Sequence, residues 1–113
     1  QVELDYEGSC ALDTDFIKAA KMTEYERVEI YNVTNGERFS TYLIAAEAGS
    51  KTVSINGAAA HKANPNDIII ICSYISMTEG EISDHSPTLV YFNESNKIVD
   101  TKSSIPTQRL RSL

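Results

Sequence analysis

The sequence predicts a mainly β protein with short helices. Most of the chain after residue 27 consists of segments rich in Val, Ile, Tyr and Thr, which favour strands. Two Asn-Gly pairs separate some of these segments and supply the positive φ angles that tight turns require. Only one short segment shows the apolar spacing of a helix.

The expected helix covers Thr14 to Met22. Phe16 and Ala20 fall on one side of it, and Asp13 or Thr14 can accept hydrogen bonds from its first free backbone N–H groups. The sequence therefore predicts a short helix near the start of the chain, capped by a carboxylate or a hydroxyl.

Five strands are expected after this helix. They cover Val28 to Val33, Arg38 to Ala45, Lys51 to Ile55, Asp67 to Met77, and Thr88 to Phe92. The Asn35-Gly36 pair is expected to close a hairpin. Asn64 to Asp67 is another turn signal, and the apolar run Ile68 to Ile71 after it suits a strand buried on both faces. We therefore expect that strand at the centre of the core.

Length and composition indicate one domain over residues 1–113. A chain of 12.5 kDa with 42% hydrophobic residues can bury a modest core. After Glu94 the sequence becomes polar with little periodicity. Residues from roughly 100 to 113 are therefore expected to be disordered or to dock on a neighbour.

The charge balance argues against nucleic acid as a partner. The chain has 10 Lys and Arg against 16 Asp and Glu, a net charge of −6, so no positive field gathers phosphates. The longest apolar run, Ile68 to Cys72, is far shorter than a membrane-spanning helix, and no charged-then-apolar leader opens the chain. We expect a cytoplasmic protein with no membrane partner, in which Cys10 and Cys72 are reduced.

General motifs leave the function open. The chain has no Gly-rich phosphate loop, and His61 and His85 have no metal-ligating partner at short spacing, so we expect no metal site.

Three segments carry more specific information. They are Tyr6-Glu7-Gly8-Ser9-Cys10, Asn32-Val33-Thr34-Asn35-Gly36-Glu37-Arg38-Phe39-Ser40-Thr41-Tyr42, and Val53-Ser54-Ile55-Asn56-Gly57-Ala58-Ala59-Ala60-His61. Together, and in this order, they closely resemble the pyruvoyl-dependent aspartate 1-decarboxylases. The resemblance runs without a gap from about Tyr6 to Met77 and more loosely to Phe92.

The resemblance implies a double-psi β-barrel and a homotetramer with active sites between neighbouring subunits. It also implies conversion of L-aspartate to β-alanine and CO2 for pantothenate biosynthesis. Removing CO2 from an α-amino acid leaves electrons on Cα, and unmodified side chains offer no sink for them. A carbonyl cofactor is therefore required, and the family makes a pyruvoyl group from its own chain.

The family's processed bond matches Gly8-Ser9. The resemblance implies that the Ser9 hydroxyl attacks the Gly8 carbonyl, and that the resulting ester eliminates to dehydroalanine, which hydrolyses to a pyruvoyl group. Residues 1–8 would then end an upstream fragment, and residues 9–113 would carry the cofactor. Glycine suits the first position because it tolerates a strained backbone and leaves its carbonyl open to attack.

Two further residues match the family's catalytic and substrate-binding positions. The pyruvoyl ketone condenses with the substrate amine as a Schiff base, and the family's later proton donor aligns with Tyr42, a neutral phenol at pH 7. Arg38 suits bidentate capture of a carboxylate. We assign Arg38 to the carboxylate that is retained, because clamping the departing one would favour the ground state over the transition state.

Thr41 matches a residue that assists processing and contacts substrate. A regular strand would direct Arg38 and Tyr42 to one face and Thr41 to the other, so either a bulge intervenes or Thr41 serves another part of the site. The segment Asn56-Gly57-Ala58-Ala59 matches the family's substrate-binding loop, in which small residues let backbone N–H groups approach the ligand.

The resemblance departs from the family at the start of the chain. Family precursors carry an upstream strand with an active-site lysine, whereas this sequence starts at Gln1, so we expect a preceding stretch in the complete protein. Whether cleavage is spontaneous or needs a maturation factor stays open. The alternative to a self-processing decarboxylase is an unprocessed, catalytically silent β-barrel that serves as a binding or assembly module.

Overall fold

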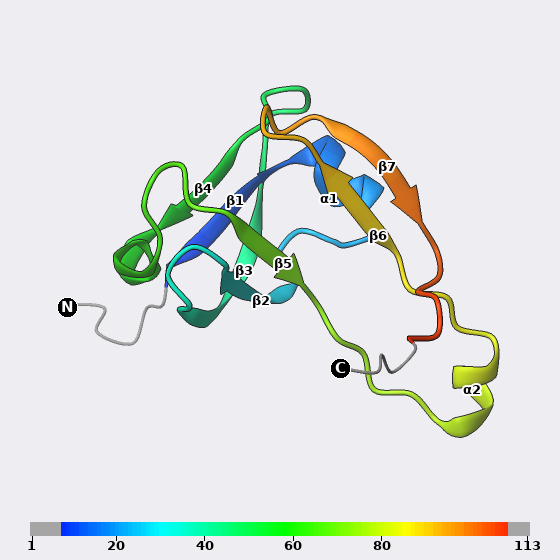
Figure 1. The fold of residues 1–113 in the computed structure, drawn as a ribbon. Helices are drawn as coiled ribbons and strands as arrows, with labels where there is room; N and C mark the ends of the chain where they lie inside the picture. Colours follow the sequence, from blue (N-terminus) through cyan, green and yellow to red (C-terminus); the bar gives the residue numbers. More distant parts are fainter. Residues whose placement is uncertain (1–7, 109–113) are drawn as a thin grey trace, which may run out of the picture. The chain divides into compact units, whose positions relative to one another are not determined.

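The computed structural model describes residues 8–108 (Figure 1). The predicted upstream fragment is therefore described only at Gly8, and the predicted tail only as far as Gln108. The chain divides into two compact units at the bond between Ser76 and Met77. That residues 1–113 form a single domain stays a prediction.

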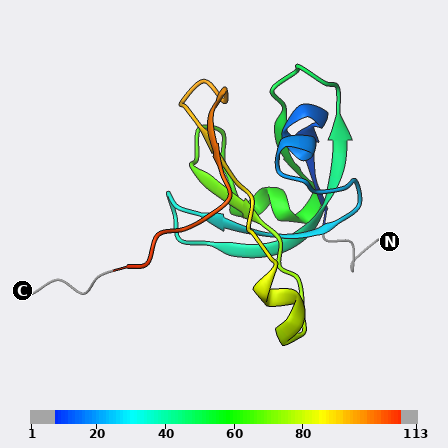
Figure 2. The same cartoon turned by 90° about the vertical axis from the view of Figure 1, so that its right-hand side faces the viewer.

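A curled five-stranded sheet forms the first unit (Figure 2). In the order β4-β1-β3-β2-β5, its strands are Val53–Asn56, Ser9–Asp13, Arg38–Ala46, Arg27–Asn32 and Ile69–Cys72. β1 pairs parallel with β3 and antiparallel with β4, while β2 pairs antiparallel with β3 and with β5. The predicted mainly β class is confirmed, and the curl of the sheet agrees with the expected double-psi β-barrel.

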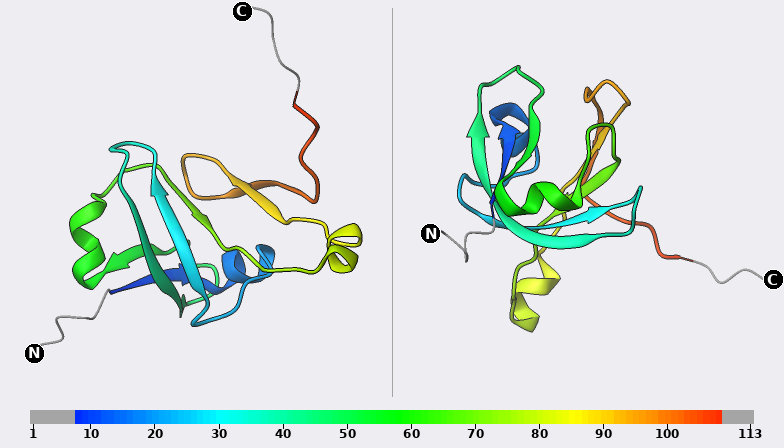
Figure 3. Two further views of the ribbon diagram at one scale, coloured as in Figure 1. Left: turned by 90° about the horizontal axis from the view of Figure 1, so that it is seen from below. Right: turned by 90° about the vertical axis from the view of Figure 1, so that its left-hand side faces the viewer.

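Two short helices lie at opposite ends of β1 (Figures 1 and 3). α1, Thr14–Ala19, is shorter than expected because the chain leaves the helix at Ala20 and Lys21 then takes a left-handed φ of 59°. The 3-10 helix η1, Gly57–Lys62, follows β4. Gly36 has a φ of 81°, and the expected hairpin between β2 and β3 is confirmed.

The second unit contains a short helix and a hairpin. α2, Glu79–Ser83, begins with a capping box in which Thr78 and Glu81 exchange hydrogen bonds. β6, Leu89–Phe92, pairs antiparallel with β7, Ile98–Lys102. The sequence interpretation missed α2 and β7, because neither has an extended apolar periodicity.

The core of the first unit lies between the sheet and α1. The buried apolar residues are Cys10, Leu12, Phe16, Ile17, Val28, Ile30, Leu43 and Ala59. The expectation that the run Ile68 to Ile71 is central was wrong, because β5 is an edge strand whose Ile70 is 51% exposed. A continuous apolar run does not distinguish a central strand from an edge strand with one uncovered face.

The buried carboxylate of Asp13 joins α1 to the connection between β3 and β4. Its Oδ1 accepts hydrogen bonds from the backbone N–H groups of Asp15 at 2.7 Å and Gly49 at 3.2 Å, and its Oδ2 accepts from Lys51 at 2.7 Å. Burial alone would raise the pKa of Asp13, but these backbone hydrogen bonds outweigh it and hold the pKa below its usual range. The sequence left the cap open between Asp13 and Thr14, and the structure assigns it to Asp13.

We expect Asp13→Asn to lower Tm at pH 7, because an amide cannot accept all three hydrogen bonds without directing its own N–H groups at backbone donors. A carboxyl with a depressed folded-state pKa stabilises the protein above its unfolded pKa, about 4, and loses this effect as pH falls through the folded value. The Tm difference from wild type should therefore shrink below about pH 4. Thermal melts across pH test this, with exposed Asp15→Asn as the control; a difference independent of pH would contradict it.

Candidate active site

Strand β3 directs the predicted site residues to two opposite faces. Its register with β2 is continuous from Tyr42 opposite Arg27 to Arg38 opposite Tyr31, with no bulge over this stretch. Side chains alternate along a regular strand. Thr41 therefore points into the core, where it is 4% exposed, while Arg38 and Tyr42 share the other face. Of the two alternatives for Thr41, the regular strand holds.

Pairing on both sides of β1 determines the surroundings of Ser9. Ser9 lies opposite Asn56 on β4, and the Asn56 side-chain amide donates to Ser9 Oγ over 3.3 Å. Cys10 lies opposite Leu43 on β3, so one step back along the same register brings Ser9 level with Tyr42. Ser9 is 2% exposed. The sheet thus brings Ser9, Asn56 and Tyr42 onto neighbouring strands.

Gly8 occupies a position that only glycine fits. Its φ is 89°, and a Cβ there would lie 2.0 Å from the main-chain oxygen of Asn56 and 3.3 Å from the Ala58 nitrogen. The first of these separations is far inside van der Waals contact. The Gly8-Ser9 bond therefore lies against the loop Asn56-Gly57-Ala58-Ala59.

The Thr41 hydroxyl is the unusual polar group of this region. Its Oγ1 is buried and has no hydrogen-bond partner. A buried hydroxyl without a partner costs free energy, so such an atom marks strain, a missing ligand or a chemical role. Continuing the β1–β3 register by two residues brings Gly8 level with Thr41, on the strand next to the predicted processed bond.

Cys10 does not compete with Ser9 as a nucleophile. Burial raises the pKa of the Cys10 thiol to about 11, so it stays protonated at neutral pH. Its side chain points into the core with Leu12. Ser9, and not Cys10, is therefore the candidate nucleophile, and it is the one that Asn56 contacts.

Arg38 is not beside Ser9 within one chain. It lies four residues before Tyr42 on β3, which corresponds to about 13 Å along the strand. Its guanidinium carbon lies 4.5 Å from the centre of the Tyr31 ring on β2. The chain thus brings together the predicted processing residues and Tyr42, and holds Arg38 apart from them.

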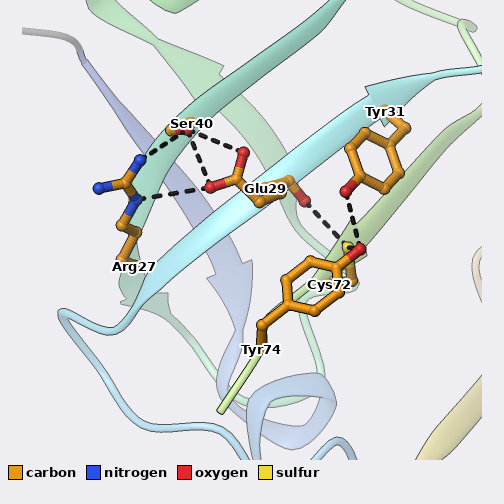
Figure 4. A network of polar contacts seen from close by, with 6 residues as sticks. All are labelled: Arg27, Glu29, Tyr31, Ser40, Cys72 and Tyr74. Atoms are coloured by element: carbon orange, nitrogen blue, oxygen red, sulfur yellow. Dashed lines mark hydrogen bonds and ion pairs between the residues drawn. The ribbon is translucent and has the colours of Figure 1, made fainter. Parts of the chain in front are cut away.

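The sequence interpretation missed a polar network on the same face of β2 and β3 (Figure 4). Ser40 Oγ donates to the Glu29 carboxylate and accepts from Arg27 Nη2 at 3.2 Å, and Arg27 Nε lies 3.4 Å from the same carboxylate. The hydroxyls of Tyr31 and Tyr74 share a hydrogen bond of 2.8 Å. The signal was present in β2, where polar residues occupy every second position.

Neither a metal centre nor a membrane span is found in the described part of the chain. No three His, Cys, Asp or Glu side chains of residues 8–108 gather closely enough to hold a metal ion. No described helix is long and apolar enough to cross a membrane.

Comparison with known proteins identifies the family. The aspartate decarboxylase family matches residues 1–99. The aspartate 1-decarboxylase of Thioalkalivibrio sulfidiphilus is 56% identical over 106 residues, which cover 94% of this chain and 84% of the relative. Those of Alcanivorax borkumensis and Tolumonas auensis are 53% and 56% identical, over 94% and 93% of this chain and 84% and 83% of their own. The fold is that of a small, mainly β protein with a curled sheet, and the matching relatives are decarboxylases. More particularly, the chain belongs to the aspartate decarboxylase family, and the predicted resemblance is confirmed.

We expect Thr41→Val to raise the free energy of unfolding by about 1 to 3 kcal/mol, because it removes a buried hydroxyl that has no partner. The comparison is made in a Ser9→Ala background, so that both chains stay uncleaved. Urea unfolding measures the difference, and exposed Thr101→Val is the control, with an effect near zero. A loss of stability in Thr41→Val would mean that the hydroxyl is satisfied in solution.

Proposed function

We propose that this chain is a self-processing aspartate 1-decarboxylase that converts L-aspartate to β-alanine and CO2 with a pyruvoyl group derived from Ser9. Membership of the aspartate decarboxylase family supports the activity. The observation that carries the proposal for the site is Gly8, which is held with a positive φ against the loop at Asn56 and directly before a buried serine.

The residues around Ser9 fit the group that the family implies. A pyruvoyl group at residue 9 would supply the carbonyl that accepts the electrons left on Cα when CO2 departs. The Asn56 amide donates to the Ser9 side chain. On the neighbouring strand β3, the buried Thr41 hydroxyl has no hydrogen-bond partner. Both donors are suited to stabilise negative charge on oxygen.

In processing, Ser9 Oγ is the nucleophile and the Gly8 carbonyl carbon its target. The new C–O bond replaces the Gly8-Ser9 amide bond, and the proton of the hydroxyl passes to the released nitrogen. Because Gly8 has no Cβ, it adopts its left-handed conformation without strain and has no side chain to shield that carbonyl. We assign Thr41 to the carbonyl oxygen of Gly8, where its hydroxyl can donate to the developing oxyanion.

In turnover, Tyr42 donates the proton to Cα after CO2 has left. It lies level with Ser9 on the neighbouring strand, on the same face of the sheet. A neutral phenol can give up this proton as a general acid. Backbone N–H groups of Gly57, Ala58 and Ala59 line the other side of the substrate, where small side chains permit close approach.

We infer that Arg38 binds the retained carboxylate in the site of a neighbouring copy. About 13 Å of strand separates Arg38 from Tyr42 in one chain, which is longer than an aspartate molecule. If the active site lies between two subunits of a homotetramer, this distance is no obstacle. Arg38 of one copy then faces Ser9 and Tyr42 of the next. The cytoplasmic location and the need for a maturation factor stay predictions.

We expect Ser9→Ala to fold but to stay uncleaved and inactive, because it lacks the attacking hydroxyl. Denaturing intact-mass spectrometry before and after borohydride reduction makes the measurement. Wild type should yield a fragment that begins at residue 9 and gains two hydrogens at its ketone, while Ser9→Ala yields one unreactive chain. Ser95→Ala, which changes an exposed serine of the second unit, is the control and should still be cleaved. An uncleaved wild type without a ketone after long incubation would favour the silent barrel instead.

Sites shared between copies also predict complementation. Arg38→Ala should raise KM for aspartate, and Tyr42→Phe should lower kcat, because one binds a carboxylate and the other donates a proton. When the two variants are refolded or coexpressed together, about a quarter of the sites combine both wild-type residues and recover normal turnover. The β-alanine yield measures this, with each variant alone as control. A mixture no more active than its components would place both residues in the same copy.

A further inference from the structure

We propose that Tyr31 is a positioning residue that holds the Arg38 guanidinium flat and ready to capture the substrate carboxylate. This inference rests on the proposed function, because it takes Arg38 as the carboxylate-binding residue. The observation behind it is the stack of Arg38 on the Tyr31 ring, with 4.5 Å between the guanidinium carbon and the ring centre.

Register produces this stack. Tyr31 on β2 lies directly opposite Arg38 on β3, so their side chains leave the sheet on the same face. A guanidinium above an aromatic face is attracted by the ring, and the planar contact leaves its N–H edge free for a carboxylate. Arg38 is exposed, and no carboxylate of the described residues forms an ion pair with it. Its charge is therefore available to a ligand.

Arg27 on the same face provides the contrast. Its guanidinium is already held by Ser40 and Glu29, so its charge is compensated within the chain (Figure 4). Of these two arginines, Arg27 has a carboxylate partner, whereas Arg38 is oriented by an uncharged ring. Orientation by a ring restricts the side chain without satisfying its hydrogen-bond donors, which reduces the entropy lost on binding.

A hydrogen bond at its hydroxyl end fixes the Tyr31 ring in turn. Its hydroxyl shares a hydrogen bond of 2.8 Å with Tyr74, and Cys72 Sγ lies 3.8 Å from the Tyr74 hydroxyl and 3.7 Å from the Glu29 carbonyl oxygen (Figure 4). The hydrogen bond with Tyr74 raises the pKa of Tyr31 most, and the contact with Cys72 raises it further, so the phenol stays neutral. Tyr74 thus anchors the hydroxyl end of the ring on which Arg38 rests.

Binding of succinate, which has the aspartate skeleton without the amine, tests the inference on the whole protein by calorimetry. Tyr31→Leu should weaken succinate binding by about two- to fivefold and raise KM for aspartate equally, with a smaller effect on kcat. Tyr31→Phe retains the ring and should restore most of the affinity. Tyr91→Leu is the matched control, because it removes the ring beneath Lys102 in the second unit and should leave succinate binding unchanged.

A double-mutant cycle separates positioning from general support of the fold. In an Arg38→Met background, Tyr31→Leu should cause no further loss of succinate affinity, because the cation that it orients is gone. An equal loss in both backgrounds, or none in wild type, would overturn the inference. Succinate binding needs neither cleavage nor turnover. Failure of the proposed function would appear separately, as wild type that binds succinate and releases no β-alanine.

Discussion

The arrangement of the site depends on the pairing of β1 along both of its edges. β4 lies on one side and β3 on the other, so Ser9 faces Asn56 across one ladder and comes level with Tyr42 across the next. Backbone hydrogen bonds on both sides fix the strand in position and direction, because a slip by one residue would turn the Cys10 and Leu12 side chains out of the apolar core. Ser9, the proposed reacting serine, is thus held by a strand that is paired along both edges, as β2 and β3 are.

The same alternation separates two kinds of chemistry. On β3, Thr41 points into the core beside Gly8, while Tyr42 and Arg38 point to the opposite face. A residue that acts on the main-chain carbonyl of Gly8 can work from the buried face, since that carbonyl belongs to the backbone and not to either face. Residues that meet a substrate have to lie on the open face. A regular strand is therefore compatible with both proposed roles without a bulge.

Much of this could be predicted from the sequence where short-range patterns decide the outcome. Asn35-Gly36 predicted its hairpin because positive φ is needed locally, and the three motifs located the loop at Asn56. The expectation for β5 failed because apolar content does not say which strand lies at an edge. The stack of Arg38 on Tyr31 could not be foreseen either, since it depends on the register between β2 and β3.

The electrostatics of the face that carries Arg27 and Arg38 depend on whether neighbouring side chains neutralise the two positive charges. An acidic chain of net charge −6 repels an anionic substrate, so a productive site needs a local cation that is not neutralised by its neighbours. Arg27 is paired with Glu29, whereas Arg38 is oriented by an uncharged ring. An aromatic support adds no negative charge, and it leaves the attraction for a carboxylate intact. Under these conditions a tyrosine is a better support for a substrate-binding arginine than a glutamate would be.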